Sequence, residues 1–298
     1  MKLQIPQPQQ VSLFIPTKYD IMVYGPSGSG KTEYGGTWSE HGTVLMADAD
    51  NGILSIKASP RIKHKDRIYR VPITDKADDP HIKQPIGYLT IKQIVEDVAA
   101  TGMYGNVKPA TIILDSATTI GTFAMSHTLF VNKRAEPVLR DWGQQMKRMI
   151  DLVTLARSIK DVNFIYIAHE QYTKDEISGQ IWCLPLITGK LAAQISLYFD
   201  EVYHSKVMQV GDKSQYVLET KPTGIITVKS RFDLPSPVPT HYDSIKGSIE
   251  KLKSGGQTDE SSQSTDSKVG IGFPKSVATS TAPTPVGKVK MGVWLDLR

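Results

Sequence analysis

Short apolar segments alternate with amphipathic ones along the first two thirds of the chain. Residues 86–100 and 138–159 carry apolar side chains three and four positions apart, which predicts two helices, and Trp142 is expected in the core. From Asp200 onward the pattern is that of β-strands and hairpins. The order predicts an α/β fold with a mostly parallel central sheet flanked by helices and a β-rich end. Apolar runs typical of buried strands occupy 19–24, 43–47, 68–73, 111–114 and 164–168.

The amino-acid composition changes near Lys253. Residues 253–288 are poor in apolar side chains and rich in Ser, Thr, Gly and Pro, which predicts a flexible tail that cannot bury enough surface to fold. The last eight residues, MGVWLDLR, are an apolar tip, either a solvated terminus or a motif that docks a partner or a neighbouring subunit. We therefore expect a folded core over 1–252 and a tail over 253–298.

Composition and charge narrow the class of protein only a little. The chain has 298 residues, a net charge of +5 and a pI of about 9.0, so the mild basic excess permits binding to a polyanion without demonstrating it. No apolar run has the 18 or so residues of a membrane span, and the first ten residues lack the apolar region of a signal peptide. Cys183 is the only cysteine. A single cysteine excludes an internal disulfide and a metal site of the Cys/His kind, and it is consistent with a reducing cytoplasm. We expect Cys183 to be a small buried apolar residue.

The loop after the first apolar run matches the phosphate-binding pattern G-x-x-x-x-G-K-[ST] at every position. Such a loop turns its backbone N–H groups inward as an anion nest, and the following helix adds its positive N-terminus. Lys31 is expected to reach the β- and γ-phosphates of ATP, and the Thr32 hydroxyl to bind Mg²⁺. The alternative is a flexible turn rich in Gly and Ser. The pattern consists of Gly25, Pro26, Ser27, Gly28, Ser29, Gly30, Lys31 and Thr32.

A second motif of the same kind of site is the run ATIILDS, an apolar strand that ends in Asp115. In P-loop ATPases a carboxylate at this place holds the Mg²⁺ shell opposite the loop threonine. Asp115 is therefore expected to act with Thr32 in holding the metal. Alternatively, Asp115 caps the helix that follows.

Polar side chains also end two further strands. Asp48 and Asp50 follow the strand after the glycine loop, and carboxylates at the carboxyl edge of a parallel sheet face the ligand crevice. Asp50 is the better candidate for the general base that activates water, unless the sequence Asp-Asn-Gly only forms a turn. His169 and Glu170 end the strand 164–168. Either they contact the γ-phosphate or they are structural.

Together these motifs resemble the RecA-like branch of the P-loop ATPases, over roughly residues 15–250. The likeness is greatest to small phage-encoded RecA-core proteins of recombination and single-strand annealing systems. The resemblance implies ATP and Mg²⁺ as ligands and a γ-phosphate sensor at His169 or Glu170. The water-activating acid of that family is usually Glu, whereas the matching residue here is Asp50, which is one methylene shorter.

The resemblance also implies contacts with other subunits and with DNA. RecA-like rings and filaments insert a basic residue of one subunit into the ATP site of the next. Lys229 and Arg231, one residue apart after an apolar segment, fit this finger role, the alternative being a solvated strand end. Residues 171–190 correspond to the mobile loop that lines the DNA channel of such filaments. The basic run 61–67 is either solvated surface or a contact for DNA phosphates.

We therefore expect an ATPase, stimulated by DNA, that oligomerises with ATP between subunits and acts on single-stranded DNA in recombination. The alternatives are a hexameric helicase-like motor or loader, a small-molecule kinase, and a switch that binds ATP without hydrolysing it. Expected partners are single-stranded DNA, further copies of the chain, and a single-strand DNA-binding protein held by the C-terminal tip. The expected compartment is the cytoplasm, that of a bacterial host if the chain is phage-encoded.

Overall fold

The computed structural model describes residues 10, 16–79, 81–176 and 178–253 of the chain. The tail expected over 253–298 therefore lies, except for its first residue, outside the described residues. No helix in the described part is long and apolar enough to cross a membrane.

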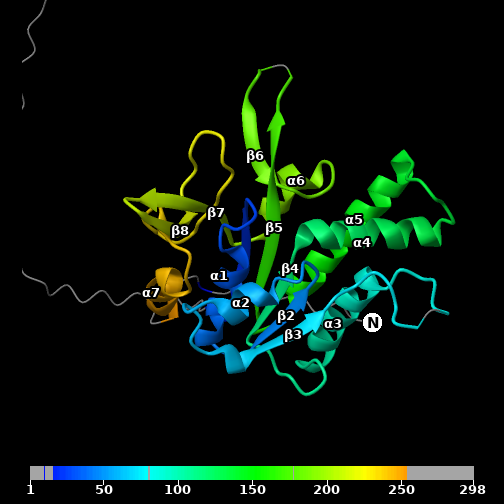
Figure 1. Cartoon of the computed structure of the whole chain (residues 1–298), viewed down its shortest axis with the longest axis horizontal. Helices are drawn as coiled ribbons and strands as arrows, with labels where there is room; N and C mark the ends of the chain where they lie inside the picture. The colour runs from blue at the N-terminus through cyan, green and yellow to red at the C-terminus, as the bar shows by residue number, and fades with distance from the viewer. Residues whose placement is uncertain (1–9, 11–15, 80, 177, 254–298) are drawn as a thin grey trace, which may run out of the picture. The chain divides into compact units, whose positions relative to one another are not determined.

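A nine-stranded sheet forms the centre of the fold (Figure 1). Along its main path the order is β3-β2-β4-β5-β1-β7-β8-β9, and β6 pairs with the outer part of β5. The six strands from β3 to β7 are parallel, whereas β8, β9 and β6 are antiparallel to their neighbours. The expected mostly parallel sheet is thus confirmed. The strands are β1 (Asp20–Gly25), β2 (Val44–Asp48), β3 (Ile68–Pro72), β4 (Thr111–Asp115), β5 (Asn163–Lys174), β6 (Ile181–Pro185), β7 (Glu201–Val210), β8 (Lys213–Glu219) and β9 (Val238–Pro239).

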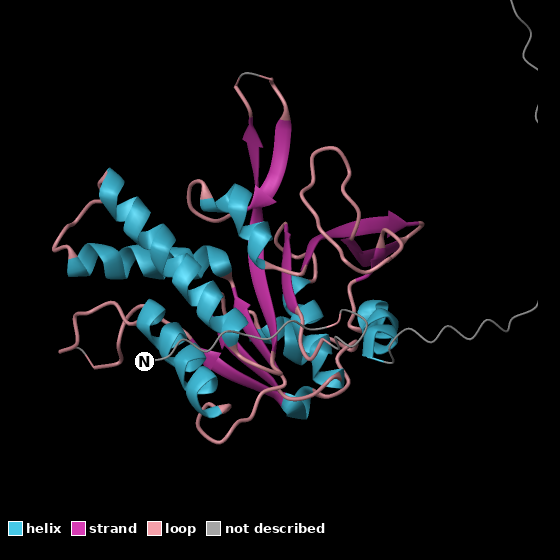
Figure 2. Cartoon of the chain, turned by 180° about the vertical axis from the view of Figure 1, so that it is seen from behind, coloured by secondary structure: helices cyan, strands magenta, loops and turns pink. Residues whose placement is uncertain are grey.

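Helices cover both faces of this sheet, as Figure 2 shows from behind. On one face, α3, α4 and α5 pack their apolar sides against the strands, and on the other α1, α2 and α7 do so. Three short 3₁₀ segments, η2 (Trp38–Glu40), η3 (Lys65–Arg67) and η4 (Ile195–Tyr198), connect these elements. The helices are α1 (Lys31–Thr37), α2 (Ile53–Ala58), α3 (Gly87–Thr101), α4 (Ala117–Val131), α5 (Leu139–Ser158), α6 (Leu191–Gln194) and α7 (Asp243–Lys253).

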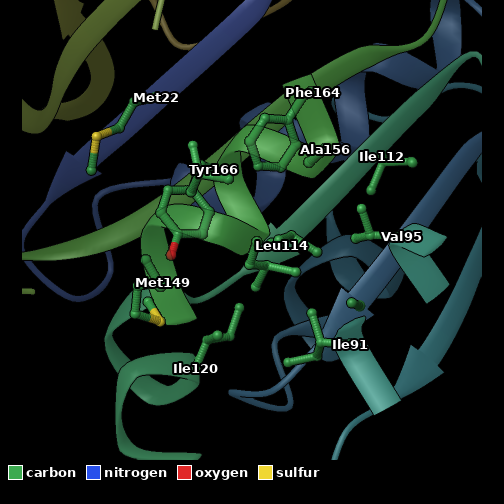
Figure 3. Close-up of a cluster of buried hydrophobic side chains, with 14 of the residues drawn as sticks. Met22, Ile91, Val95, Ile112, Leu114, Ile120, Met149, Ala156, Phe164 and Tyr166 are labelled. Atoms are coloured by element: carbon green, nitrogen blue, oxygen red, sulfur yellow. The ribbon is translucent and has the colours of Figure 1, made fainter. Parts of the chain in front are cut away.

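Strands β1, β2, β4 and the first half of β5 are mostly apolar because both of their faces are buried, whereas β3 and β7 also carry charged side chains. In β1, Met22 and Tyr24 belong to the cluster under α3–α5, whereas Ile21 and Val23 belong to the cluster under α1 and α7. Figure 3 shows the first cluster, in which Ile91 and Val95 of α3 face side chains of β4 and β5. This two-sided burial explains why each strand was recognisable as a continuous apolar run.

Four details differ from the expectations. Helix α4 was anticipated only as a helix after Asp115, without bounds, because Thr, Gly and Ser are spread through its apolar sequence, and Ser116 rather than Asp115 caps it. The segment 171–190, expected as a mobile loop, contains a β-hairpin of β5 and β6. Within the region after Asp200 that was expected to form strands, the apolar segment 225–230 forms only isolated bridges. Trp142, expected in the core, has 42% of its surface exposed.

Candidate active site

The glycine loop connects β1 to α1 at the carboxyl edge of the sheet. Gly28 and Gly30 have φ angles of +76° and +88°, which non-glycine residues adopt only with strain. Gly30 is the residue that caps the amino end of α1. The backbone of this loop therefore has the conformation that a phosphate-binding nest requires, directly before a helix N-terminus.

Lys31 is buried against its own loop. Its Nζ donates hydrogen bonds to the carbonyl oxygens of Gly25 (2.9 Å) and Pro26 (2.7 Å). Burial lowers the pKa of Lys31, and the charges of neighbouring carboxylates, Asp115 first, only partly oppose this shift. The ammonium group thus lies across the mouth of the loop, where an anion could replace the carbonyl oxygens as its partner.

Thr32 and Asp115 come together as the sequence predicts. The Thr32 hydroxyl donates a hydrogen bond to Asp115 Oδ2 over 2.7 Å. Burial, and after it the charges of Asp50 and Asp48, raise the pKa of Asp115 to about 6, although the hydrogen bond from Thr32 opposes this shift. Hydroxyl and carboxylate oxygens are the donors that Mg²⁺ prefers, and a divalent cation would relieve the burial of this carboxylate, so the pair fits the ion.

Asp50 stands on the turn between β2 and α2 and points at the same cavity. It accepts hydrogen bonds from the Thr119 hydroxyl and, over 3.2 Å, from His169 Nε2. Burial tends to raise the pKa of Asp50, but hydrogen bonds from His169, Ser116 and Thr119 outweigh it and hold the pKa at about 2. The same residue belongs to a tight turn, because Asn51 has a φ of +58°. Asp50 therefore both belongs to a turn and faces the cavity, so the two alternatives given for it in the sequence analysis do not exclude each other.

Asp48 has a different environment. It is fully buried, accepts hydrogen bonds from Gly52 N (2.8 Å) and Ile53 N (3.3 Å) at the start of α2, and pairs with Arg70 Nε at 2.7 Å. Its carboxylate is thus occupied in holding the β2–α2 turn, which leaves Asp50 as the acid of this pair that faces the cavity.

His169 and Glu170, adjacent on β5, point in opposite directions, as successive strand residues do. His169 lines the cavity with Asp50. Glu170 instead accepts a hydrogen bond from His204 Nε2 over 2.8 Å, and the Nδ1 of the same histidine lies 2.8 Å from Glu219. Of the two sensor candidates, only His169 is therefore placed at the cavity.

A cluster of nitrogen, oxygen and sulfur donors lies beside the cavity. Among the described residues, Glu170, Cys183 and His204 have ligand atoms within 4.8 Å of one another and could hold a metal ion. Cys183 is buried as expected, and burial together with the charge of Glu170 raises the pKa of its thiol to about 12. The sequence analysis had excluded a metal site of the Cys/His kind because there is one cysteine, but this group adds a carboxylate to one Cys and one His, which the cysteine count does not exclude.

Lys229 and Arg231 lie at the opposite edge of the sheet. Lys229 pairs with Val202 near the start of β7, and its Nζ donates to the Phe199 carbonyl over 2.6 Å. Arg231 forms an ion pair with Asp200 at 2.7 Å, with 63% of its side chain exposed. Because β7 is parallel to β1, this position is at the amino end of the strands. The structure does not bring either residue to the cavity of its own chain.

The cavity that joins these groups has a volume of about 610 Å³, within the usual range for small-molecule sites. Four of its residues, Glu33, Ser55, Thr119 and Tyr216, were not anticipated, since no motif marks them. Its lining is Ser27, Gly28, Ser29, Gly30, Lys31, Thr32, Glu33, Asp50, Asn51, Gly52, Ser55, Asp115, Thr119, His169 and Tyr216.

Comparison with known proteins places the chain in a family. No curated protein matches it. Among solved structures, a KaiC-like protein of Pyrococcus horikoshii aligns with 11% identity and a TM-score of 0.39, over 74% of this chain and 81% of the other. The RadB recombinase aligns with 12% identity and a TM-score of 0.38, over 71% of this chain and 86% of the other. Both scores are too low to add to the fold described above.

A family model described as an AAA domain matches residues 17–232, well over half of the chain. The matched range contains the glycine loop, Asp115 and the strands that surround the cavity. Membership implies that the protein binds nucleotide, a property that usually involves Mg²⁺. The chain therefore belongs to the AAA domain family of P-loop ATPases.

Proposed function

We propose that the protein hydrolyses ATP and acts on single-stranded DNA in recombination, by annealing or strand pairing, as an assembly with ATP between subunits. The observation that carries this proposal is the convergence on one cavity of Lys31, the Thr32–Asp115 pair and the Asp50–His169 pair. These are groups for binding phosphate, for holding a metal ion and for positioning water, in one place.

In this proposal the glycine loop and Lys31 bind the phosphates of ATP, with Lys31 exchanging its two carbonyl partners for phosphate oxygens. Thr32 and Asp115 would hold the Mg²⁺ of the metal–nucleotide complex, and the ion would supply neutralisation of the phosphate charge. The burial of Asp115 keeps water from competing for its carboxylate.

Asp50 positions the attacking water. With a pKa of about 2, its carboxylate is ionised at every physiological pH and is a weak base, since general-base catalysis is most effective when the pKa lies near the operating pH. We therefore assign Asp50 mainly to accepting a hydrogen bond from the water and orienting it. His169, 3.2 Å from Asp50, is placed to link that carboxylate to the terminal phosphate.

The distance of Lys229 and Arg231 from their own cavity supports a role in another subunit. Both side chains are anchored on consecutive residues, Phe199 and Asp200, and so occupy one patch of the surface. In a ring or filament that brings this patch to the next cavity, the two cations would neutralise charge on the phosphates during transfer.

The β5–β6 hairpin supports an interaction with single-stranded DNA. It projects beyond the helices in both views (Figures 1 and 2). Tyr172 and Trp182 are 61% and 37% exposed, and aromatic side chains with a nearby cation such as Lys174 provide stacking platforms for bases. His169 lies on the same strand, β5. A change at the terminal phosphate could therefore be transmitted along β5 from His169 to the hairpin.

The experiment that tests the proposal measures ATP hydrolysis with and without single-stranded DNA. We expect wild-type turnover to rise with DNA and turnover of Lys31→Ala to vanish. Trp182→Ala should lose the stimulation while keeping basal turnover, whereas Trp142→Ala, which removes a tryptophan of similar exposure on α5, should behave as wild type. Turnover indifferent to DNA would contradict the role in recombination, and strand unwinding would favour a helicase-like motor.

A mixing experiment tests the finger. Lys31→Ala has a defective ATP site and an intact finger, whereas Arg231→Ala has an intact ATP site and a defective finger. If the finger acts between subunits, the two inactive variants should recover part of the activity when mixed, because some interfaces then combine an intact site with an intact finger. Absence of recovery, with both variants still assembling, would contradict a role for Arg231 in a neighbouring site.

A further inference from the structure

The cavity extends to both sides of β1. Asp115 and His169 come from β4 and β5, on one side of β1 in the sheet, and Asp50 follows β2 on that same side. Tyr216 comes from β8, which lies beyond β7 on the other side. The two groups of residues thus mark opposite ends of the space above the glycine loop.

Tyr216 closes its end of the cavity in a fixed position. A Cβ atom added to Gly30 would lie 3.1 Å from Tyr216 Cδ1 and 3.4 Å from Arg61 Nη2, so both side chains pack directly on the loop. The backbone carbonyl of Tyr216 accepts a hydrogen bond from Thr240 N over 3.0 Å. The ring is nevertheless 37% exposed and lines the cavity.

Arg61 fixes the ring further. Its guanidinium carbon lies 4.9 Å from the centroid of the Tyr216 ring, within the range of a cation–π contact. The same guanidinium pairs with Glu33 and donates to the Thr240 carbonyl over 3.3 Å. Tyr216 and Arg61 therefore form a flat pair at the rim, in which Glu33 and the Thr240 carbonyl already engage the guanidinium group.

The direction of the phosphate chain decides what this pair can bind. Asp115, which would hold the metal ion with Thr32, lies on the same side of β1 as Asp50 and His169. A metal ion held there would favour the terminal phosphate at this end of the cavity, and the nucleoside would then lie at the end formed by Tyr216.

We propose that Tyr216, with Arg61 against its ring, is the stacking platform for the base of the bound nucleotide. This inference rests on the proposed function, since it requires a nucleotide in the cavity. Stacking is available to any base, because every base has a π-face, and the charged groups of Arg61 and Glu33 are engaged with each other. The platform therefore binds purine nucleoside triphosphates with little discrimination between adenine and guanine.

The test compares ligands with and without a base. Affinities for ATP, GTP and inorganic tripolyphosphate, each with Mg²⁺, are measured by calorimetry on the wild type, Tyr216→Ala and Tyr216→Phe. Tyr69→Ala serves as the control, because Tyr69 is exposed on β3, at the far end of the sheet. Loss of one stacked base is expected to weaken ATP and GTP about tenfold in Tyr216→Ala. Tripolyphosphate should bind all variants equally, and Tyr216→Phe and Tyr69→Ala should match the wild type.

The outcomes separate this inference from the function on which it rests. If wild type binds ATP no better than tripolyphosphate, or Tyr216→Ala weakens both equally or neither, the platform is refuted while nucleotide binding stands. If GTP binds at least a hundredfold more weakly than ATP, a base-reading contact is present and stacking alone is refuted. If wild type binds none of the ligands, the proposed function fails, and the platform with it.

Discussion

The first glycine of the loop, Gly25, is required by packing rather than by phosphate. A Cβ atom added there would overlap the Ser205 carbonyl oxygen of β7 and lie 3.1 Å from the carbonyl carbon. The obstacle is backbone of a paired strand, so it cannot rotate away. Gly25 also has a φ of +155°, which an L side chain rarely adopts. We therefore predict that Gly25→Ala is strongly destabilising even without nucleotide.

Gly28→Ala is the matched control. Gly28 also has a positive φ, of +76°, but an added Cβ would meet nothing within 4 Å. The backbone strain should cost about 1–2 kcal/mol. Gly25→Ala adds an overpacking cost of about 1–3 kcal/mol, for a total of about 3 kcal/mol or more.

Urea and thermal unfolding of the nucleotide-free protein measure both free energies. For a chain of this size about 1 kcal/mol lowers the melting temperature by about 2–4 °C, so Gly25→Ala should melt well below Gly28→Ala. If the two variants unfold within 1 kcal/mol of each other, about the smallest difference that overpacking predicts, the collision with β7 is not what fixes this glycine.

Three further variants test the groups around the cavity. His204→Leu should lower the free energy of unfolding by about 3 kcal/mol, because the partly buried Glu170 and the buried Glu219 lose the histidine that they share, although Glu219 keeps Lys206 as an ion-pair partner. Glu170→Gln in the same background should recover part of this loss in urea titrations. Asp48→Asn should lose stability by a few kcal/mol while the turnover of the remaining folded protein is kept, and loss of turnover alone would contradict its structural role. Burial lowers the pKa of His127, so the folded protein binds a proton at this residue less readily than the unfolded chain does. The contribution of His127 to stability should therefore be complete above pH 6.5 and should fall as the pH drops from there toward the folded pKa. In unfolding measured across pH, His127→Gln should remove this pH dependence.

The sequence predicts the parallel sheet well because buried parallel strands are continuous apolar runs, and it predicts the Thr32–Asp115 contact because two motifs share one mechanism. Alternation along a strand could have separated His169 from Glu170, since adjacent residues cannot both face one cavity. The place of Tyr216 could not be predicted. The hairpin of β7 and β8 was expected, but its place beside the glycine loop depends on β7 pairing with β1, two segments that are far apart in the sequence. The hairpin of β6 was missed because its five residues are too few for a periodic signal.

The hydrogen bonds of Lys31 to its own loop have a consequence for the resting protein. With Gly25 and Pro26 as acceptors, the loop itself supplies hydrogen-bond partners to the buried ammonium group. An incoming phosphate must then compete with two neutral acceptors that are already in place, and gains only the difference between a charged and an uncharged partner. The loop carbonyl groups thus compete with phosphate for Lys31, and this competition weakens the binding of nucleotide and favours the release of product.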